Sequence, residues 1–516
     1  MERVLIVGAG EGGRIIAREL QTMLRWKLRP VGFVDDDHRK IGRVICDVPV
    51  LGDTDAIPAL VRSEEIDVVI IAIPSAATST HKHLVALAQG TNAHVMTMPA
   101  LGSILRGESR VTTLRSVRPV DVLGRPVVQP DRESCLQFVQ NRSVLITGAA
   151  GSIGAELAVQ ISRLEPSQLL LLDTNESGLY DLEIDIHRTA PEINVETIIA
   201  SVTDAARIDR VFRTWHPEIV IHAAAYKHVP AMESQPDQAV ETNIVGTDVV
   251  VRHAAAYDAS RFILISTDKA VRPTSVMGAS KRLAELAVAV VGKQTGLSVC
   301  SVRFGNVLGS RGSVIPTFER QIRAGGPVTV TDPRMKRYFM TIPEAVSLVI
   351  QAGAFGHRNV TYILDMGQEV SILDLARRVI SLHGLRENTD IEIEFTGARP
   401  GEKLYEELTL DFEQAHETPH PKIRLIDGTT SKLSFDAFPE RIAGLVRLAS
   451  TGSEELRLHL HRLIEDIDGD SPALATMRRG ASPAIDVSPT ASTSTPVPPT
   501  DAMTMRPAAA STSHPY

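Results

Sequence analysis

The stretch Thr147-Gly-Ala-Ala-Gly-Ser-Ile-Gly154 decides the fold of this chain, because it lies between an apolar run that predicts a strand and a helical pattern. Gly148 permits a tight turn, Gly151 lets the backbone approach a pyrophosphate, and Gly154 allows the helix to pack closely on the strand. Free N–H groups at the start of the helix attract an anion. The stretch therefore predicts a dinucleotide-binding turn.

Asp173 strengthens this prediction, because it closes the next expected strand, about 20 residues further on. A carboxylate there accepts both hydroxyls of an adenosine ribose and repels a 2′-phosphate, so NAD is favoured over NADP. The alternative is an aspartate that only ends a strand. The cofactor contacts expected from the turn and the following strand ends are Gly148, Ala150, Gly151, Ser152, Ile153, Gly154, Asp173, Asp204, Ala223, Ala224 and Ala225. Where related domains often carry an acidic residue after the third strand, this chain has Ser201.

Six apolar runs separated by helical patterns predict a doubly wound parallel sheet around this turn. The expected strands are 144–147, 168–173, 195–200, 218–222, 261–266 and 297–303. We therefore expect the catalytic domain over residues 141–450.

A first Rossmann-like domain is expected over residues 1–100, with strands at 4–7, 31–34, 67–73 and 94–98. Its opening run carries the same glycine spacing, Gly8, Gly10 and Gly13, with Asp35 at the end of the second strand. These residues either form a second nucleotide site or make a compact strand-to-helix turn, and the sequence leaves both readings open. Residues 101–140 read as a connector, and the Ser/Thr/Pro/Ala-rich residues 470–516 as a disordered tail.

Composition narrows the range of functions. The chain has 516 residues, 43% of them hydrophobic and 22% charged, which suits two soluble domains. A net charge of -8 and 4% aromatic residues disfavour nucleic-acid binding. The three cysteines form no CxxC pair, so we expect neither a disulfide framework nor a metal site, and a reducing cytoplasm fits. No apolar run has the length of a membrane span.

The candidate active site is Ser266-Thr-Asp-Lys-Ala-Val-Arg-Pro-Thr-Ser-Val-Met-Gly-Ala-Ser-Lys281, which starts at the end of an expected strand, where open α/β sheets bind ligands. Met277 and Lys281 are four residues apart and so share one helix face. Short-chain dehydrogenases have Tyr-x-x-x-Lys at this spacing. An isolated Asp268-Lys269 pair is more often a solvated turn, and an isolated methionine is more often core filler.

This string resembles the nucleotide-sugar 4,6-dehydratases of the polysaccharide-biosynthesis family for capsule and O-antigen (lipopolysaccharide), in the group with Met in place of Tyr. The same resemblance extends to 222–230, Asn243 with Gly246, 303–313, 332–339 and 399–405. It implies two tandem Rossmann-like domains, of which the second is an extended short-chain dehydrogenase fold with a small C-terminal substrate-binding subdomain. It also implies tightly bound NAD and conversion of UDP-N-acetylglucosamine to UDP-2-acetamido-2,6-dideoxy-4-hexulose.

The resemblance implies a role for each catalytic candidate. Asp268 would protonate the departing C6 hydroxyl, and Lys269, as a neutral amine, would remove the C5 proton. Thr267 would hold the sugar near O4, and Lys281 would hold the nicotinamide ribose. Met277 occupies the tyrosine position but cannot accept the 4-hydroxyl proton, which we expect to go to Asp268.

Contacts to the UDP-sugar are expected from Lys227, His228, Asn306, Arg311, Ser313, Arg337, Arg399 and Glu402. Lys227 and His228 are equally compatible with surface polar residues. The competing functions are a nucleotide-sugar 4-epimerase of the same fold, which needs no C5 base, and a non-catalytic nucleotide-binding regulator. We expect a cytoplasmic homo-oligomer, at the inner face of the membrane if a longer form exists, because the resemblance implies N-terminal membrane helices that this sequence lacks.

Overall fold

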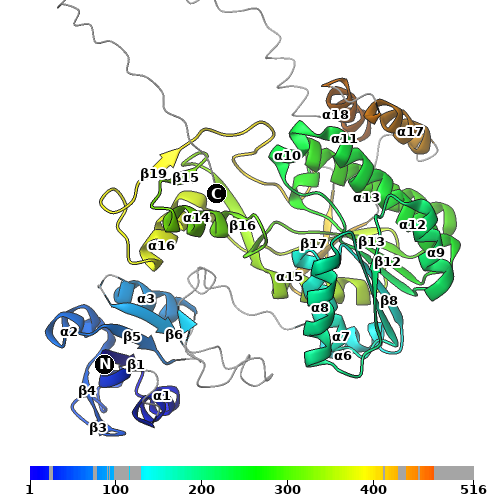
Figure 1. Ribbon diagram of the computed structural model, residues 1–516. Helices are drawn as coiled ribbons and strands as arrows, with labels where there is room; N and C mark the ends of the chain where they lie inside the picture. Colours follow the sequence, from blue (N-terminus) through cyan, green and yellow to red (C-terminus); the bar gives the residue numbers. More distant parts are fainter. Residues whose placement is uncertain are drawn as a thin grey trace, which may run out of the picture. The chain divides into compact units, whose positions relative to one another are not determined.

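The structure of this chain is a computed structural model that describes residues 1–22, 27–73, 78–89, 91, 93–97, 115–116, 130–410, 413–427, 437–450 and 454–469. The predicted tail and most of the predicted connector lie outside these residues. The two α/β parts are described separately below (Figure 1).

The first part is a mainly parallel sheet in the strand order β3-β4-β2-β1-β5-β6-β7. Its strands are β1 (Glu2–Val7), β2 (Leu28–Val34), β3 (Val44–Ile45), β4 (Val48–Gly52), β5 (Val68–Ile71), β6 (His94–Thr97) and β7 (Arg115–Ser116). Its helices are α1 (Glu11–Thr22), the short 3-10 helix η2 (Thr54–Ala56), α2 (Ile57–Ser63) and α3 (Thr78–Gln89). Strand β7 lies inside the predicted connector, where no strand was expected, and it pairs antiparallel with β6 of the first part.

The second part is built on a sheet in the order β10-β9-β8-β11-β12-β13-β17-β21-β20. The predicted strands are present as β8 (Ser143–Thr147), β9 (Gln168–Asp173), β10 (Val195–Ile199), β11 (Ile219–His222), β12 (Arg261–Ile265) and β13 (Val299–Arg303). Further parallel pairing adds β17 (Val360–Leu364), and β21 (Ile423–Asp427) and β20 (Ala415–Glu417) continue the sheet antiparallel. The predicted tandem α/β fold is confirmed.

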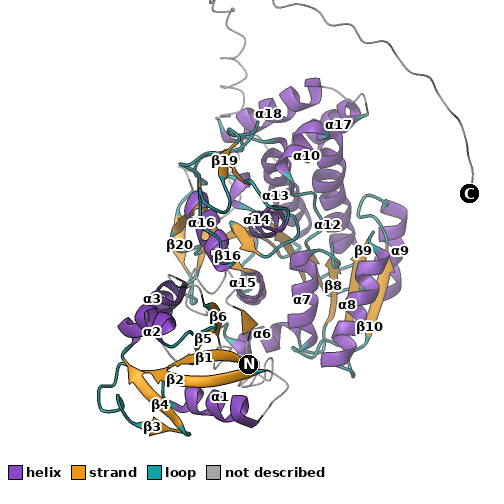
Figure 2. Ribbon diagram, turned by 60° about the vertical axis from the view of Figure 1, so that its left-hand side comes forward, coloured by secondary structure: helices purple, strands orange, loops and turns teal. Residues whose placement is uncertain are grey.

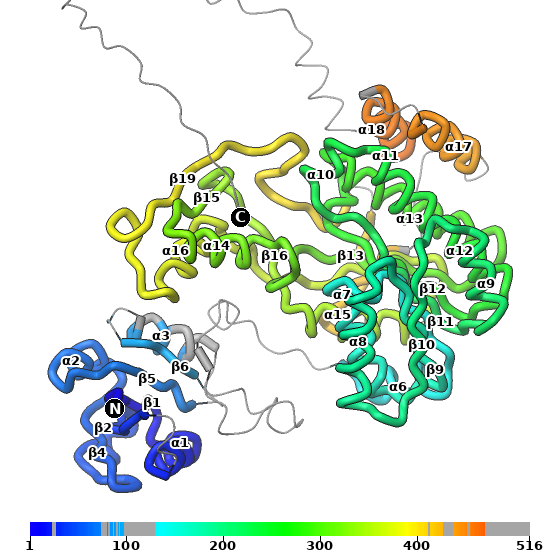
Figure 3. The backbone as a smooth tube through the Cα atoms, viewed as in Figure 1, coloured from blue at the N-terminus to red at the C-terminus, as the bar shows by residue number. Residues whose placement is uncertain are grey.

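Helices cover both faces of this sheet, because each buried strand presents alternate apolar side chains to the two sides. One face packs against α6 (Arg132–Val139), α7 (Ser152–Ser162), α8 (Glu176–Thr189) and α15 (Ile342–Ala354). The other packs against α9 (Ala205–Trp215), α12 (Gly246–Ala256) and α13 (Val276–Thr295). Figures 2 and 3 show this layering, with α12 and α13 side by side.

Helix α6 corrects the predicted boundary of the connector. Asp131 caps it by accepting from the backbone N–H groups of Glu133 and Ser134, and Cys135 and Val139 are buried in the core of the second part. The sequence pattern did not reveal this helix. Short helices are stabilised by such packing more than by the intrinsic helix propensity of their residues. The catalytic part therefore begins near residue 131, not after 140.

The site is surrounded by shorter elements between the strands. After β11 come α10 (Val229–Ser234), α11 (Pro236–Ala239) and a π-helical turn, η3 (Val240–Val245), and the 3-10 turn η4 (Asp268–Ala270) follows β12. A small subdomain contains β14 (Asn306–Leu308), α14 (Val314–Arg323), β15 (Val328–Val330), β16 (Lys336–Thr341), β18 (Glu369–Ser371), α16 (Ile372–Leu382) and β19 (Ile393–Phe395). Helices α17 (Phe438–Ala449) and α18 (Glu454–Asp468) pack at the α13 side.

Candidate active site

The turn between β8 and α7 has no room for side chains at two of its glycines. Gly148 has φ +68°, and a Cβ there would lie 2.6 Å from the backbone N of Ala224. A Cβ on Gly154 would lie 2.1 Å from the carbonyl oxygen of Gly148. Gly151, by contrast, would place its Cβ 3.1 Å from that oxygen. The turn thus has the close packing and the open helix start that a pyrophosphate requires.

Asp173 stands at the end of β9 and faces this turn. Its Oδ2 accepts a hydrogen bond of 3.0 Å from the backbone N of Ala150, and its Oδ1 accepts one of 2.9 Å from the N of Asn175. The carboxylate is only partly buried, so it can still receive ribose hydroxyls. Asp204, predicted as a further cofactor contact, is exposed and instead caps α9 by accepting from the N of Arg207.

The first part of the chain repeats this geometry. Gly8 has φ +98°, and a Cβ on Gly13 would lie 1.9 Å from the Gly8 carbonyl oxygen, whereas Gly10 has open space around it. Asp35 accepts from the N of Ala9 at 2.7 Å and also pairs with Lys40 at 2.9 Å. The turn is compact in the same way, but here the carboxylate of Asp35 already forms an ion pair with Lys40.

The loop 223–228 reaches the glycine turn from the end of β11. Asn243 of the π-helical turn is fully buried and fastens this loop, because its side chain accepts from the N of Tyr226 and donates to the O of Tyr226 and to Ser280 Oγ. Beyond it, Lys227 and His228 are exposed. Burial of its ammonium nevertheless lowers the pKa of Lys227, and partial burial lowers that of His228.

The catalytic candidates at the end of β12 lie together, and Asp268 is fully buried. Its Oδ1 accepts hydrogen bonds of 2.9 Å from Thr267 Oγ1 and 2.9 Å from Lys269 Nζ. Within the described residues its Oδ2 is buried without a partner. Burial raises the pKa of Asp268 above its ordinary value, and the charge of Glu406 adds to this rise, although the charge of Lys269 lowers the pKa in part. A proton that reaches Asp268 is therefore held more firmly than on an ordinary aspartate.

Lys269 differs from the expected neutral amine. Burial by itself lowers the pKa of Lys269, but the carboxylates of Asp268 and Glu406 overcome that effect and raise the pKa above its ordinary value. Its ammonium lies 2.9 Å from Asp268, 3.1 Å from Asn306 Oδ1 and 3.6 Å from Glu406 Oε1. The pKa of Lys269 is thus not depressed, as a resting neutral amine would require, because two acids surround this lysine.

Glu406 is the residue that the sequence reasoning missed. Its carboxylate is 2% exposed and lies between Lys269 and Arg337. Burial by itself raises the pKa of Glu406, but Lys269 and Arg337 lower it below its ordinary value. It directly follows the motif 399–405, so its place beside that motif was the one available signal.

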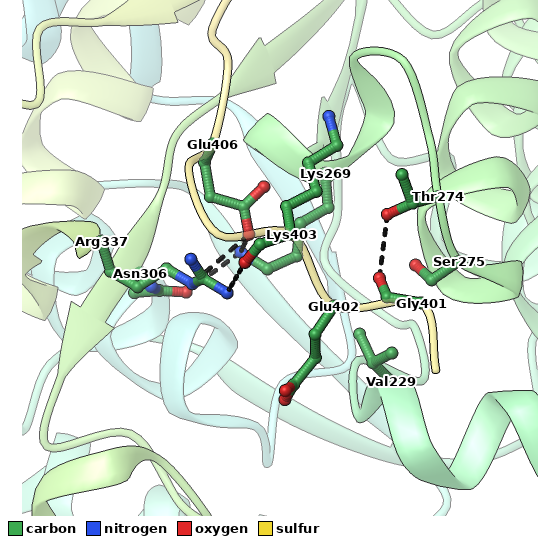
Figure 4. A pocket seen from close by; sticks show the side chains of 10 residues that line it. All are labelled: Val229, Lys269, Thr274, Ser275, Asn306, Arg337, Gly401, Glu402, Lys403 and Glu406. Atoms are coloured by element: carbon green, nitrogen blue, oxygen red, sulfur yellow. Dashed lines mark hydrogen bonds and ion pairs between the residues drawn. The ribbon is translucent and has the colours of Figure 1, made fainter. Parts of the chain in front are cut away.

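A pocket opens beside these residues, and Figure 4 shows the side chains that surround it. Asn306, Arg337 and Glu406 lie together on one side, and Thr274, Ser275 and Gly401 on the other. The lining consists of Val229, Lys269, Thr274, Ser275, Asn306, Arg337, Gly401, Glu402, Lys403 and Glu406. Of the predicted sugar-nucleotide contacts, Asn306, Arg337 and Glu402 thus lie at the pocket.

The remaining predicted contacts are placed elsewhere. Arg311 lies at the glycine turn, where its backbone N donates to Ser152 Oγ at 3.3 Å and its Nη1 to the Ala150 O at 3.4 Å. Ser313 directly precedes α14 as its N-cap residue, and Arg399 is exposed. Arg337, which lines the pocket, is 8% exposed and donates to the carbonyls of Lys336, Lys403 and Leu404. Those hydrogen bonds hold the backbone of residues 403 and 404 beside β16.

Helix α13 begins with Met277 and Lys281 on one face, as predicted. Ser275 caps the helix by accepting from the Gly278 N. Met277 is 4% exposed and belongs to an apolar cluster with side chains of η3, α13 and α18. Lys281 is 6% exposed, and burial lowers its pKa to about 8 against the opposing charge of Glu285.

An ionic cluster underlies the site. Glu285 of α13 accepts 2.8 and 2.7 Å hydrogen bonds from Arg303 and one of 2.6 Å from Ser266 Oγ, directly before Thr267. Arg282 donates to Asp468 of α18 and to Glu285. Both arginines are fully buried. Burial by itself raises the pKa of Glu285, but the two arginines hold it at about 2.

No described helix combines the length and the apolar character needed to cross a membrane. No three His, Cys, Asp or Glu side chains in the described ranges are grouped as metal ligands would be.

Comparison with known proteins gives two family matches. Residues 144–427 match the family described as polysaccharide biosynthesis protein, and residues 1–99 match a CoA-binding domain. The capsular polysaccharide biosynthesis protein CapD of Staphylococcus aureus is 44% identical over 407 residues, which make up 78% of this chain and 68% of that protein. A UDP-glucose 4-epimerase of Rickettsia bellii is 32% identical over 53% of this chain and 80% of its own length.

Among solved structures, that of Pen from Bacillus thuringiensis is similar to the second part, with a TM-score of 0.52 and 34% sequence identity. The match covers 56% of this chain and 89% of that one. The family match spans more than half of the sequence. It covers the strands of the sheet that carries the glycine turn and the Thr267–Lys269 segment. The chain therefore belongs to the polysaccharide biosynthesis protein family and has the short-chain dehydrogenase type of fold that nucleotide-sugar dehydratases and epimerases share.

Proposed function

We propose that this chain is a UDP-N-acetylglucosamine 4,6-dehydratase that acts in surface polysaccharide synthesis. The observation that carries the proposal is Asp268: a fully buried carboxyl whose pKa is raised by burial, beside a lysine, at the end of β12 in the sheet that carries the glycine turn. A dehydratase needs a group that takes a proton, retains it and delivers it to a leaving hydroxyl. The sugar itself is assigned from the sequence resemblance.

NAD is the proposed cofactor, and the residues fit it. Gly148 and Gly154 leave no room for side chains in the turn that a pyrophosphate would approach, and Asp173, which faces this turn, would accept the hydroxyls of the adenosine ribose. Ala223–Ala225 form the opposite wall, and the buried Lys281 would donate to the nicotinamide ribose. When bound, NAD would accept a hydride from sugar C4 and return it to C6, so no net oxidation results.

The residues of the chain supply the proton transfers. Asp268 accepts the proton of the 4-hydroxyl as C4 becomes a ketone. Thr267, whose hydroxyl donates a hydrogen bond to Asp268, orients the 4-hydroxyl of the sugar. The ketone acidifies the C5 hydrogen. Loss of the C5 proton then expels the C6 hydroxyl, which leaves as water with the proton that Asp268 holds. Burial of Asp268 excludes water and allows the proton to be retained between the two steps.

The test is a mass measurement. Purified protein incubated with UDP-N-acetylglucosamine and NAD should yield a product lighter by one water. Asp268→Asn should abolish this loss, because the amide cannot receive the O4 proton. A product of unchanged mass from the unaltered protein would sink the proposal.

A 4-epimerase is the second candidate, since one relative is named UDP-glucose 4-epimerase. An epimerase also oxidises C4 but returns the hydride to C4, and it needs no acid for the C6 hydroxyl. Conversion of the sugar to its C4 epimer without a change in mass would identify this activity. The buried pair of Asp268 and Lys269 favours elimination.

A further inference from the structure

Glu406 lies in the strap, by which we mean residues 399–407. The strap is fastened to the catalytic loop and to β16 at several points. Thr274 Oγ1 donates to the Gly401 O at 2.9 Å, and Lys403 Nζ donates to the Val271 O at 2.9 Å. Arg337 Nη2 donates to the Lys403 O at 2.7 Å. These hydrogen bonds fix the backbone of the strap and therefore the position of the Glu406 side chain.

That side chain faces the catalytic lysine (Figure 4). Oε1 of Glu406 lies 3.6 Å from Lys269 Nζ and 3.4 Å from Arg337 Nε. Its Oε2 is buried and has no hydrogen-bond partner among the described residues. A buried carboxylate oxygen without a partner costs free energy that a structural role alone does not explain.

The ammonium of Lys269 faces three acceptors and donates hydrogen bonds to two of them. An ammonium has three N–H donors, and three acceptors surround it: Asp268 Oδ1, Asn306 Oδ1 and Glu406 Oε1. The amide oxygen of Asn306 cannot take the proton away. In this arrangement Lys269 removes a proton from carbon only after it has passed one of its own to a carboxylate.

The proton count of the proposed dehydration identifies that carboxylate. Two protons leave the sugar before the product forms, one from O4 and one from C5. Asp268 takes the first and holds it until the C6 hydroxyl departs, so it is neutral when the C5 proton leaves. Glu406 is then the ionised carboxylate that remains against Lys269, and with Asp268 neutral the amine has lost the larger of the two charges that raise its pKa.

We propose that Glu406 is a catalytic residue that accepts a proton from Lys269 and thereby frees the amine to remove the C5 proton. The C5–H bond breaks toward Lys269 Nζ, the proton displaced from Nζ goes to Glu406, and the C5–H electron pair forms the new double bond as the C6–O bond breaks. When hydride returns to C6, Lys269 returns a proton to C5 and recovers its own from Glu406. This inference rests on the proposed dehydratase function.

The test compares Glu406→Gln with Glu407→Gln. Glutamine keeps the shape and a hydrogen-bonding oxygen but accepts no proton. Glu407 is the matched control, because it is the neighbouring acid and pairs instead with Arg272 and Lys403. Glu406→Gln should still oxidise C4, seen as 340 nm absorbance of the reduced cofactor after mixing with UDP-N-acetylglucosamine. Water loss should slow by a factor on the order of 100 or more, and Glu406→Asp should restore part of it.

The readouts separate the possible failures. If the unaltered protein gives no water loss, the proposed function fails. If the unaltered protein is active and Glu406→Gln matches it, Glu406 is not a proton acceptor. A Glu406→Gln protein that neither melts like the parent nor oxidises C4, while Glu406→Asp is equally inactive, would assign Glu406 a purely structural role and overturn the inference.

Discussion

Arg282 and Asp468 form a buried ion pair in which Nη2 of the arginine lies 2.7 Å from Oδ1 of the aspartate, while its Nε contacts both carboxylate oxygens. The aspartate is the last residue of α18, and the arginine follows Lys281 on α13. The family match ends at residue 427. A helix beyond the matched region therefore supports the catalytic helix.

The first prediction concerns this pair. Asp468→Asn should destabilise the protein by about 3–5 kcal/mol, because it leaves the fully buried charge of Arg282 without its principal counter-ion. Urea unfolding measures the change. Asp466→Asn is the control, since Asp466 is about half exposed and pairs with Arg441 at the surface. Equal stability of the two variants would contradict a supporting role for α18.

Two lysines of the site, Lys281 and Lys269, should respond to charge removal with opposite signs. Burial lowers the pKa of Lys281 to about 8 from its ordinary 10.5, so the unfolded chain binds more protons between these pH values and stability rises with pH there. Lys281→Met removes this penalty. Its unfolding free energy should exceed that of the parent at pH 7, and the difference should shrink as the pH rises from about 8 toward 10.5.

Lys269→Met should instead destabilise the protein at pH 7. Its partners Asp268 and Glu406 hold the pKa of Lys269 above its ordinary value despite burial, and its removal takes a counter-ion away from two buried acids. Urea titrations of both variants at pH 7 and pH 10 test the pair. A stabilising Lys269→Met would mean that the ammonium is not held by these acids.

The glycine turn allows folding and cofactor binding to be separated. Gly154→Ala places a Cβ 2.1 Å from the Gly148 O, so both the fold and NAD binding should be lost. Gly151→Ala places it at 3.1 Å, a distance that a small shift relieves, so the protein should fold but bind NAD more weakly, because the Cβ lies where the pyrophosphate approaches. Melting temperature and NAD titration measure the two effects. Undiminished NAD binding by Gly151→Ala would argue against the turn as the pyrophosphate site.

Met277→Tyr tests whether the site can accept the residue that short-chain dehydrogenases usually have there. Met277 is packed in an apolar cluster and 4% exposed, so the larger side chain should cost about 1–3 kcal/mol and lower activity. Met277→Leu, which nearly conserves volume, should change both little. Dehydration rates and denaturant midpoints provide the comparison, and a large gain in rate with tyrosine would refute the expectation.

The sequence predicted the parts of the molecule that depend on local pattern. Alternating apolar runs gave β8 to β13 within a residue or two, and the glycine spacing gave the turn, because both follow from backbone geometry within a few residues. The segment 266–281 likewise places Asp268 and Lys281 in the site. For these residues, the sequence immediately around them was sufficient to predict their place in the site.

Contacts between residues far apart in the chain were harder to predict from the sequence. The charge state of Lys269 depends on Glu406, which is distant in the chain, so the lysine was expected to be neutral. Arg337 resembled a phosphate ligand by residue type, but the strap carbonyls that occupy it are invisible in the sequence. The role of Asp468 and the added strands β17, β20 and β21 depend in the same way on tertiary contacts.

The way in which Arg337 holds the strap has a consequence for redesign of the site. The guanidinium contacts the main-chain carbonyls of residues 403 and 404, so it is indifferent to the side chain at Leu404. Substitution there should be well tolerated, whereas adding or deleting one residue between Gly401 and Glu406 would shift the carboxylate along the chain and away from Lys269. The length of this segment, more than its composition, sets where the second acid stands.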